Sequence, residues 1–193
     1  MKQKISKINI LIKKKYKYEL LENGFSSKDI SVGKKVLNSK RITMAQNTRS
    51  FENAFAKKLG AKYALMVNSG SSANLLALSS LKLKKGGEVI TPTLTFSTTV
   101  APIYQLGLIP NFVGVLENKF IVDPKQIEKA INKNTVAIMI PNLLGNIPNW
   151  YLINKIVKKY NLPIIEDSAD TIGYTVNNKN TGKLSDIVTN SFY

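Results

Sequence analysis

Two short segments of the chain combine glycine and serine, or an aromatic ring, in patterns that suit a bound phosphate and a flat ring. Residues 68–74 read NSGSSAN, where Gly70 allows a close turn and the hydroxyls of Ser71 and Ser72 stand among the free amides of a helix start. Such a turn binds phosphate, although an ordinary serine cap with a glycine turn explains it equally well. The segment is neither a Walker A loop nor GxGxxG. Residues 91–97 read TPTLTFS, and Phe96 could lie over a ring beside the phosphate, although core packing is the commoner use of phenylalanine.

A third segment, IIEDSAD at residues 164–170, runs from two apolar residues directly into Glu166 and Asp167. A carboxylate is costly to bury unless it pairs with a cation, and a protonated pyridine nitrogen would be such a partner. The alternative is an exposed aspartate that caps a helix. Phosphate turn, stacking ring and buried acid together describe the needs of pyridoxal phosphate, whose ring accepts electrons from a substrate carbanion. A fourth segment, NSFY at residues 190–193, indicates by itself only the end of another strand.

These segments must be positioned by strands that alternate with helices. The pattern predicts an α/β fold, a mostly parallel sheet with helices on both faces, in which ligands bind beyond the carboxyl ends of the strands. Asp123 and Pro124 open one helix, with Gln126 reaching back in a capping box. The expected strands are residues 63–67, 88–91, 109–113, 136–140, 163–166 and 186–189, and the expected helices are residues 51–59, 72–83, 96–106 and 151–160.

Composition removes several classes of chemistry. The chain has 193 residues, a formal charge of +16, and neither cysteine nor histidine, which excludes disulfides, thiolate or histidine metal sites and Ser-His-Asp triads. No metal site is expected. No signal peptide or membrane-spanning run is seen, so a cytoplasmic protein without membrane contact is expected. The excess charge is almost all lysine, densest at residues 13–17, and favours a solvated surface over a nucleic-acid site.

The chain resembles the DegT/StrS family of pyridoxal-phosphate-dependent sugar aminotransferases and 3-dehydratases, which have the aspartate-aminotransferase fold. The stretches that carry the resemblance are RITMAQNTRSFENAFAKKLGAKYALMVNSGSSANLLAL, EVITPTLTFSTTVAPI, LLGN, IIEDSAD and TNSFY. Residues 1–40 are lysine-dense and weakly periodic, which predicts a lead-in segment. The match implies part of a cofactor-binding large domain at residues 41–193. It departs from the family at Asn142, where a histidine is often found, and at Ala45, where a glycine is common.

The resemblance also implies roles for single residues. Gly70, Ser71 and Ser72 would hold the phosphate of pyridoxal or pyridoxamine phosphate, with a further contact from Ser191. Phe96 would stack on the ring and Asp167 would bind the pyridine nitrogen. Asp170 falls where aminotransferases usually place His or Gln beside the cofactor's 3-hydroxyl.

SGSSANLL, LGN, Asp170 and SFY resemble the branch that removes a 3-hydroxyl from nucleotide-linked 4-keto-6-deoxy sugars, commonly for surface polysaccharides. The alternatives are a nucleotide-sugar aminotransferase, a non-catalytic remnant and, last, a nucleic-acid-binding domain. The catalytic lysine or histidine is expected three positions beyond Tyr193. The chain is therefore expected to be the amino-terminal portion of a homodimeric enzyme, inactive and poorly soluble alone.

Overall fold

The computed structural model describes residues 24–192, and the chain divides into two units, residues 1–45 and 46–193. The described part of the first unit holds one helix, α2 (Ser27–Asn38). The Ser26 hydroxyl accepts the amide N–H of Asp29, and the Asp29 carboxylate accepts the amide N–H of Ser26. This reciprocal capping starts the helix, and its hydrogen bonds lower the pKa of Asp29. The lysine cluster at residues 13–17 lies outside the described residues.

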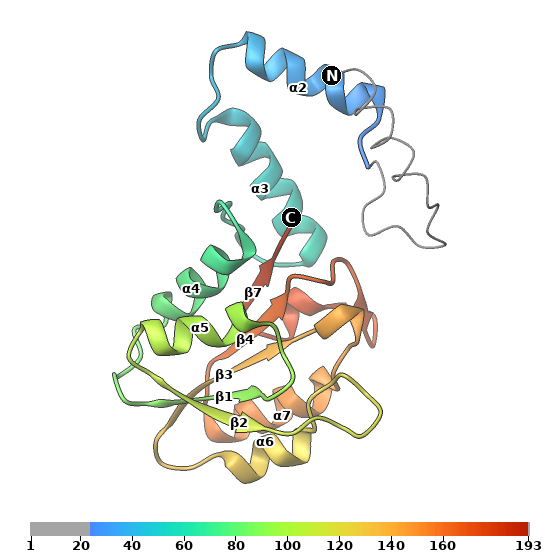
Figure 1. Ribbon diagram of the computed structural model, residues 1–193. Helices are drawn as coiled ribbons and strands as arrows, with labels where there is room; N and C mark the ends of the chain where they lie inside the picture. The colour runs from blue at the N-terminus through green and yellow to red at the C-terminus, as the bar shows by residue number, and fades with distance from the viewer. Residues whose placement is uncertain (1–23, 193) are drawn as a thin grey trace, which may run out of the picture. The chain divides into compact units, whose positions relative to one another are not determined.

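A five-stranded parallel sheet forms the centre of the second unit (Figure 1). Its order is β2-β1-β3-β4-β7, and each neighbouring pair is parallel. The strands are β1 (Glu88–Pro92), β2 (Ile109–Val113), β3 (Thr135–Pro141), β4 (Ile164–Ser168) and β7 (Ile187–Asn190). Since parallel strands need crossover connections, the helices between them cover the sheet. The α/β class expected from the sequence is confirmed.

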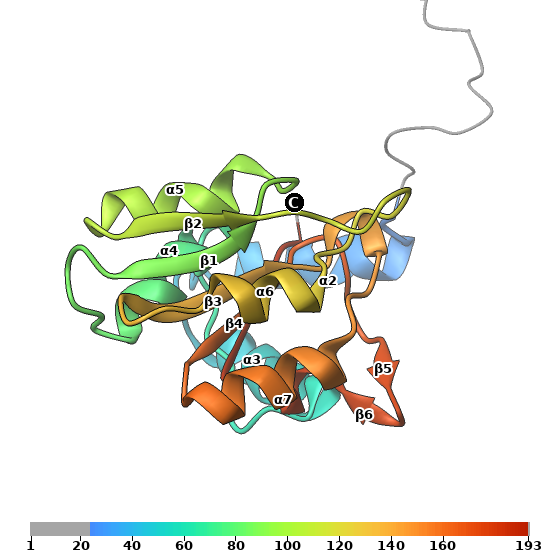
Figure 2. The same ribbon diagram turned by 90° about the horizontal axis from the view of Figure 1, so that it is seen from below.

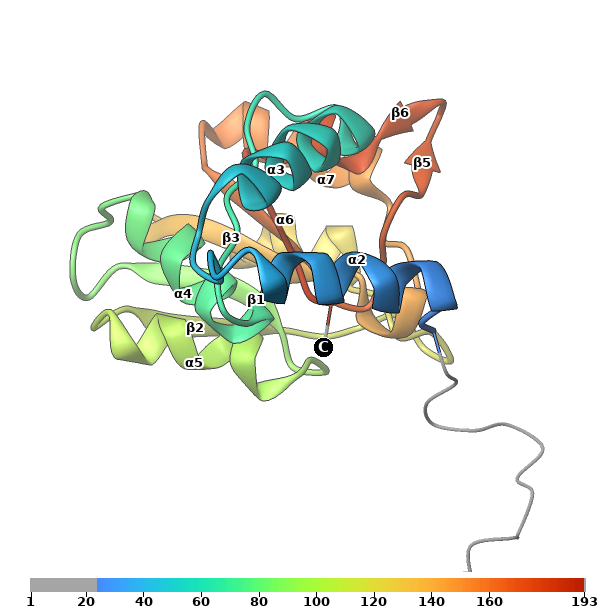
Figure 3. The same cartoon turned by 90° about the horizontal axis from the view of Figure 1, so that it is seen from above.

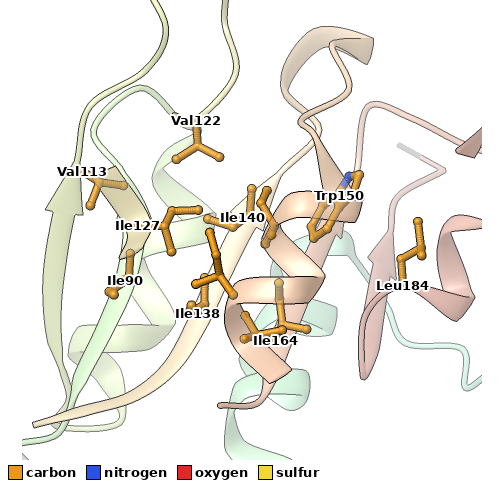
Figure 4. Packing of buried hydrophobic residues seen from close by; sticks show 12 residues of the cluster. Ile90, Val113, Val122, Ile127, Ile138, Ile140, Trp150, Ile164 and Leu184 are labelled. Carbon is orange, nitrogen blue, oxygen red and sulfur yellow. The ribbon is translucent and has the colours of Figure 1, made fainter. Parts of the chain in front are cut away.

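Helices pack on both faces of this sheet (Figure 2). Helices α4 (Gly70–Ser80) and α5 (Ser97–Gln105) cover one face, and α6 (Pro124–Ala130) and α7 (Trp150–Tyr160) cover the other. Side chains alternate along each strand, so Ile165 packs under α4 and α5 while Ile164 packs under α7. Figure 4 shows the core on the α6–α7 side, where the buried Trp150 ring lies near Ile140. Among the described residues, no helix is long and apolar enough to cross a membrane.

Helix α3 (Gln46–Leu59) packs beside the sheet's β7 end through aromatic rings. Phe51 and Phe55 of α3 both contact Phe192, with ring centroids 5.4 Å apart in each pair. Asn180 donates a hydrogen bond of 2.8 Å from its amide to the carbonyl of Lys58. Figure 3 shows α3 beside the small antiparallel hairpin β5 (Thr175–Val176) and β6 (Lys179–Asn180). Two single-turn 3₁₀ helices, η1 (Leu143–Gly145) and η2 (Thr181–Lys183), complete the unit.

Two local expectations are wrong. Residues 63–67 form no strand, because no neighbouring strand pairs with them; the amide of Met66 instead donates to the Glu52 carboxylate at 2.8 Å. Asp123 does cap α6, but Gln126 does not complete a capping box. The Gln126 side-chain oxygen accepts the amide N–H of Gly114 at 2.8 Å and joins α6 to the segment after β2.

Candidate functional site

The polar residues singled out from the sequence lie at the carboxyl ends of the strands or at the starts of α4 and α5. Figure 1 shows how these elements are arranged. β4 reaches this edge at Ser168 and β7 reaches it at Asn190, directly before Ser191. The strands are parallel, so their ends and the following helix starts share one edge. The topology therefore brings four sequence-distant segments to one place.

The glycine-serine turn lies directly against the segment that follows β7. Ser69, not Ser71 or Ser72, caps α4 by accepting the amide N–H of Ser72 at 3.2 Å. A Cβ atom built on Gly70 would lie 2.9 Å from the Cβ of Ser191 and 3.2 Å from its hydroxyl oxygen. Glycine is therefore required here by close approach, and the approach brings Gly70 and Ser191 together. These two predicted phosphate residues meet where free helix amides offer donors to an anion.

Asp167 lies in β4 and faces α4 and α5. Its side chain is 5% exposed. One carboxylate oxygen, Oδ2, accepts hydrogen bonds from the Asn74 amide at 2.8 Å and the Thr99 hydroxyl at 2.7 Å. The other, Oδ1, accepts the amide N–H of Ala169 at 3.2 Å. The aspartate is thus a buried acid and not an exposed helix cap, as the sequence alone left open.

Phe96 and Asp170 lie at the same edge but in more open surroundings. Phe96 occupies the position before α5, and its side chain is 66% exposed. Asp170 is exposed on the loop after β4, where its carboxylate accepts the amide N–H of Leu144 at 2.9 Å. Leu144 has a positive φ of 53°, a conformation that is rare for a branched residue. The Asp170 contact therefore ties the loop after β4 to the turn after β3.

A second buried carboxylate, Glu166, lies on the opposite face of the sheet and was given no role by sequence reasoning. It is fully buried, and its Oε1 accepts hydrogen bonds from Asn142 at 2.9 Å and from Ser168 at 2.7 Å. The Tyr174 hydroxyl donates to it at 3.3 Å. Burial, followed by the negative charge of Glu166, raises the pKa of Tyr174 well above its usual range. Period-two alternation along β4 was the available signal, because adjacent strand residues face opposite sides.

No role was predicted from the sequence for two asparagines, Asn142 and Asn74. Asn142 accepts the indole N–H of Trp150 at 2.8 Å, and its backbone N–H donates to the carbonyl of Asp167 at 2.9 Å. Asn74 lies inside α4, where asparagine is a poor helix former. A polar residue on the buried side of a helix is the sequence signal that could have identified it, since such a residue needs partners.

Comparison with known proteins places these features in a family context. The sequence pattern described as the DegT/DnrJ/EryC1/StrS aminotransferase family matches residues 25–193. The chain is 38% identical over 183 residues to a GDP-4-keto-6-deoxy-D-mannose 3-dehydratase of Escherichia coli O55:H7, covering 91% of the chain and 47% of that protein. It is 36% identical over 158 residues to a dTDP-3-amino-3,6-dideoxy-alpha-D-galactopyranose transaminase of Aneurinibacillus thermoaerophilus, covering 82% of the chain and 44% of that protein.

A solved structure agrees with the fold. The E. coli GDP-4-keto-6-deoxy-D-mannose-3-dehydratase with bound hydrated pyridoxal phosphate superposes with a TM-score of 0.80 at 39% identity. That match covers 84% of the chain and 43% of the solved chain. The present chain thus spans a little under half the length of the relatives it matches.

Proposed function

Because the chain belongs to the DegT/DnrJ/EryC1/StrS aminotransferase family, we propose that it is the cofactor-binding, amino-terminal portion of an enzyme that modifies nucleotide-linked deoxysugars. The observation that carries the proposal is Asp167, a buried carboxylate held by two side-chain donors at the edge where Gly70 and Ser191 meet. A buried acid fits the ring nitrogen of pyridoxal or pyridoxamine phosphate, and a helix start with a turn that has no room for a side chain fits its phosphate.

Each predicted site residue then has a proposed role. The glycine-serine turn, with Gly70, Ser71 and Ser72, would hold the phosphate together with Ser191. The exposed Phe96 ring would hold the pyridine. Asp167 would accept a hydrogen bond from the ring N–H and so favour the charged form of that nitrogen, and Asp170 would contact the 3-hydroxyl. When bound, the cofactor supplies the electron-accepting ring. Burial of Asp167 excludes water from the carboxylate, which strengthens its attraction for the ring nitrogen.

The reaction we favour is removal of the 3-hydroxyl of a nucleotide-linked 4-keto-6-deoxy sugar, in a pathway of surface polysaccharides. Support comes from the 38% identity to a 3-dehydratase and from Asp170, an acid where aminotransferases usually have His or Gln. The second candidate is a nucleotide-sugar aminotransferase, which the 36% identity to a transaminase supports. A homodimer that works in the cytoplasm belongs to the same proposal.

Cofactor binding is tested by equilibrium dialysis of the chain against pyridoxamine 5′-phosphate, which needs no lysine for attachment. We expect saturable binding that weakens about tenfold or more in Asp167→Asn, because a charged hydrogen bond is lost. Asp186→Asn is the matched control, since Asp186 accepts the amide N–H of Ile164 at the opposite, amino-terminal edge of the sheet. Equal binding by all three proteins, or none by the unaltered chain, would contradict the proposal.

The choice between 3-dehydratase and aminotransferase is tested with the full-length protein that contains this chain. Mass spectrometry after incubation with a GDP- or dTDP-linked 4-keto-6-deoxy sugar distinguishes the two candidates. Loss of the 3-hydroxyl oxygen supports the dehydratase, and gain of an amino group supports the aminotransferase. If neither product forms, the proposed reaction is wrong even where the cofactor binds.

A further inference from the structure

Asn74 connects the parts of the site more extensively than its position inside a helix suggests. It is 1% exposed and lies four residues after Gly70 on α4. Its side-chain NH₂ donates to the backbone carbonyl of Thr98 at 3.1 Å and to Oδ2 of Asp167 at 2.8 Å. Its side-chain oxygen accepts the hydroxyl of Thr189 at 2.6 Å. One side chain therefore joins α4 to α5, β4 and β7.

The chemistry of these partners fixes the orientation of the Asn74 amide. The carbonyl of Thr98 and the carboxylate of Asp167 only accept hydrogen bonds, so both must face the NH₂ group. The Thr189 hydroxyl can donate, and its other acceptor, the carbonyl of Glu166, is farther away at 3.4 Å. A flipped amide would place its oxygen against two acceptors. The orientation that presents a donor to Asp167 is thus the only one that satisfies every partner.

The two carboxylate oxygens of Asp167 accept different hydrogen bonds. Oδ2 receives the two side-chain donors, Asn74 and Thr99, whereas Oδ1 receives the longer bond from the amide of Ala169 among the described residues. Thr99 is itself buried and accepts the Thr95 hydroxyl at 2.9 Å, which directs its own proton toward Asp167. The two donors therefore fix the plane of the carboxylate through Oδ2 and leave Oδ1 with acceptor capacity.

We propose that Asn74 is a positioning residue, itself held by Thr189. It orients Asp167 so that Oδ1 accepts a hydrogen bond from the ring N–H of the bound cofactor. This inference rests on the proposed function. Gly70 and Asn74 belong to one helix, and Thr189 and Ser191 flank the end of one strand. The phosphate turn and the acid are therefore kept in register by the same two elements, at a spacing that a rigid cofactor must match.

A purely structural role for Asn74 makes a different prediction, and two ligands separate the two cases. The first is pyridoxamine 5′-phosphate. The second is its deaza analogue, in which a C–H group replaces the ring nitrogen, so that the Asp167 contact alone is lost. The ratio of the two affinities measures the Asp167 contact, whereas general damage to the site weakens both ligands alike.

We expect Asn74→Leu to lower this affinity ratio about tenfold, to the level of Asp167→Asn, and to weaken the deaza analogue little. The double variant should show no further drop, because both changes remove one interaction. As a second readout, ¹⁵N resonance of the labelled ring should show the nitrogen's pKa raised on binding to the unaltered chain and returned toward the free value in Asn74→Leu. Asn154→Leu, which removes a hydrogen bond from α7 to the carbonyl of Leu184, is the matched control and should change neither readout.

Should circular dichroism show Asn74→Leu unfolded, Thr189→Val and Thr189→Ser replace it. The valine removes the donor that orients the amide and should lower the ratio, and the serine should restore it. Thr135→Val, at the opposite end of β3, controls for loss of a buried threonine hydroxyl. An unchanged ratio, or equal loss for both ligands, overturns the positioning role. A ratio near one in the unaltered chain overturns the proposed function itself.

Discussion

Gly70 is the residue at which the site leaves no room for a side chain. Its φ is not in the left-handed region, so the restriction is steric: an added Cβ would meet the Cβ of Ser191 at 2.9 Å. We expect Gly70→Ala to destabilise the fold by about 1–3 kcal/mol, as overpacking does, and to weaken binding of pyridoxamine 5′-phosphate. Thermal unfolding and dialysis measure the two effects.

The steric cause has its own control at the residue scale. Adding Ser191→Gly to Gly70→Ala should recover most of the lost stability, because the clashing atoms are removed. Gly33→Ala is the matched glycine change, since nothing lies within 4 Å of a Cβ there. Gly33 lies inside α2, where alanine should stabilise by up to about 1 kcal/mol. A fully stable Gly70→Ala chain with normal ligand binding would disprove the close-approach argument.

Asn142 offers a second residue-scale prediction, because it bonds the chain's single tryptophan. Asn142→Leu leaves the Trp150 indole N–H and the buried Glu166 each without one partner. We expect a loss of about 1–3 kcal/mol in the free energy of unfolding, as for buried polar groups left unsatisfied. The tryptophan emission should move to shorter wavelength as the indole loses its acceptor. Asn154→Leu, on the same helix as Trp150, should leave the emission maximum unchanged.

The site residues differ in how much of their role could be predicted from the sequence. Asp167 and the glycine-serine turn were predictable because a strand that ends in acids and a turn that starts a helix are local patterns. For Asn74 the helix pattern indicates only that a buried polar residue needs partners. The partners of Asn74 and Asn142 could not be predicted, since they lie 93 and 24 residues away, at Asp167 and Glu166. Only the folded sheet shows which of the two adjacent acids faces which helix pair.

At the scale of elements, Glu88 joins the start of β1 to its neighbours. Its carboxylate accepts hydrogen bonds from the side chains of Asn132 and Asn111, each at 2.8 Å. These bonds, that from Asn132 first, hold the pKa of Glu88 below its ordinary value of 4.5. A carboxyl group with a lowered pKa in the folded state contributes stability that is present above the unfolded pKa and is lost as the pH falls through the folded one.

We therefore expect the unaltered chain to lose more stability than Glu88→Gln when the pH is lowered from about 5 to about 3. At neutral pH the variant should be the less stable protein, because its amide offers a donor where the two asparagines also donate. Near the acid end the two stabilities should converge, as protonated glutamate comes to resemble glutamine. Urea unfolding at a series of pH values measures this, and parallel curves for the two proteins would refute the effect of Glu88.

Element boundaries show where local patterns are insufficient. The strand predicted at residues 109–113 is observed with the same limits, because β2 pairs with its neighbour β1. Residues 63–67 carry a similar apolar run but form no strand, because pairing is a property of the sheet and not of the run. Gln126 likewise satisfies a local capping pattern, yet it bonds Gly114, which the fold brings within reach. Sequence periodicity thus predicted the alternation of strands and helices, whereas partners distant in the sequence determine which runs pair as strands and which hydrogen bonds a side chain makes.

At the scale of the whole molecule, two properties oppose each other. The chain carries a net charge of +16, which keeps copies apart. The second unit nevertheless exposes large apolar side chains, among them Phe96, Tyr104, Phe112 and Phe192, which are 66%, 62%, 47% and 51% exposed. Exposed aromatic side chains favour association with another surface. Which effect prevails depends on salt, because salt screens the charge and leaves the apolar attraction intact.

We therefore expect the chain to self-associate, and to do so more strongly as salt rises from about 0.05 M to about 0.5 M, where the screening length shortens from above 10 Å to a few ångströms. Sedimentation velocity at fixed protein concentration measures the change. A Phe112→Lys variant, which adds charge to the exposed edge strand β2, should shift the equilibrium toward monomer at every salt concentration. Association that weakens as salt rises would instead indicate contacts between opposite charges, and a monomer at all salt concentrations would show that the charge outweighs the exposed apolar surface.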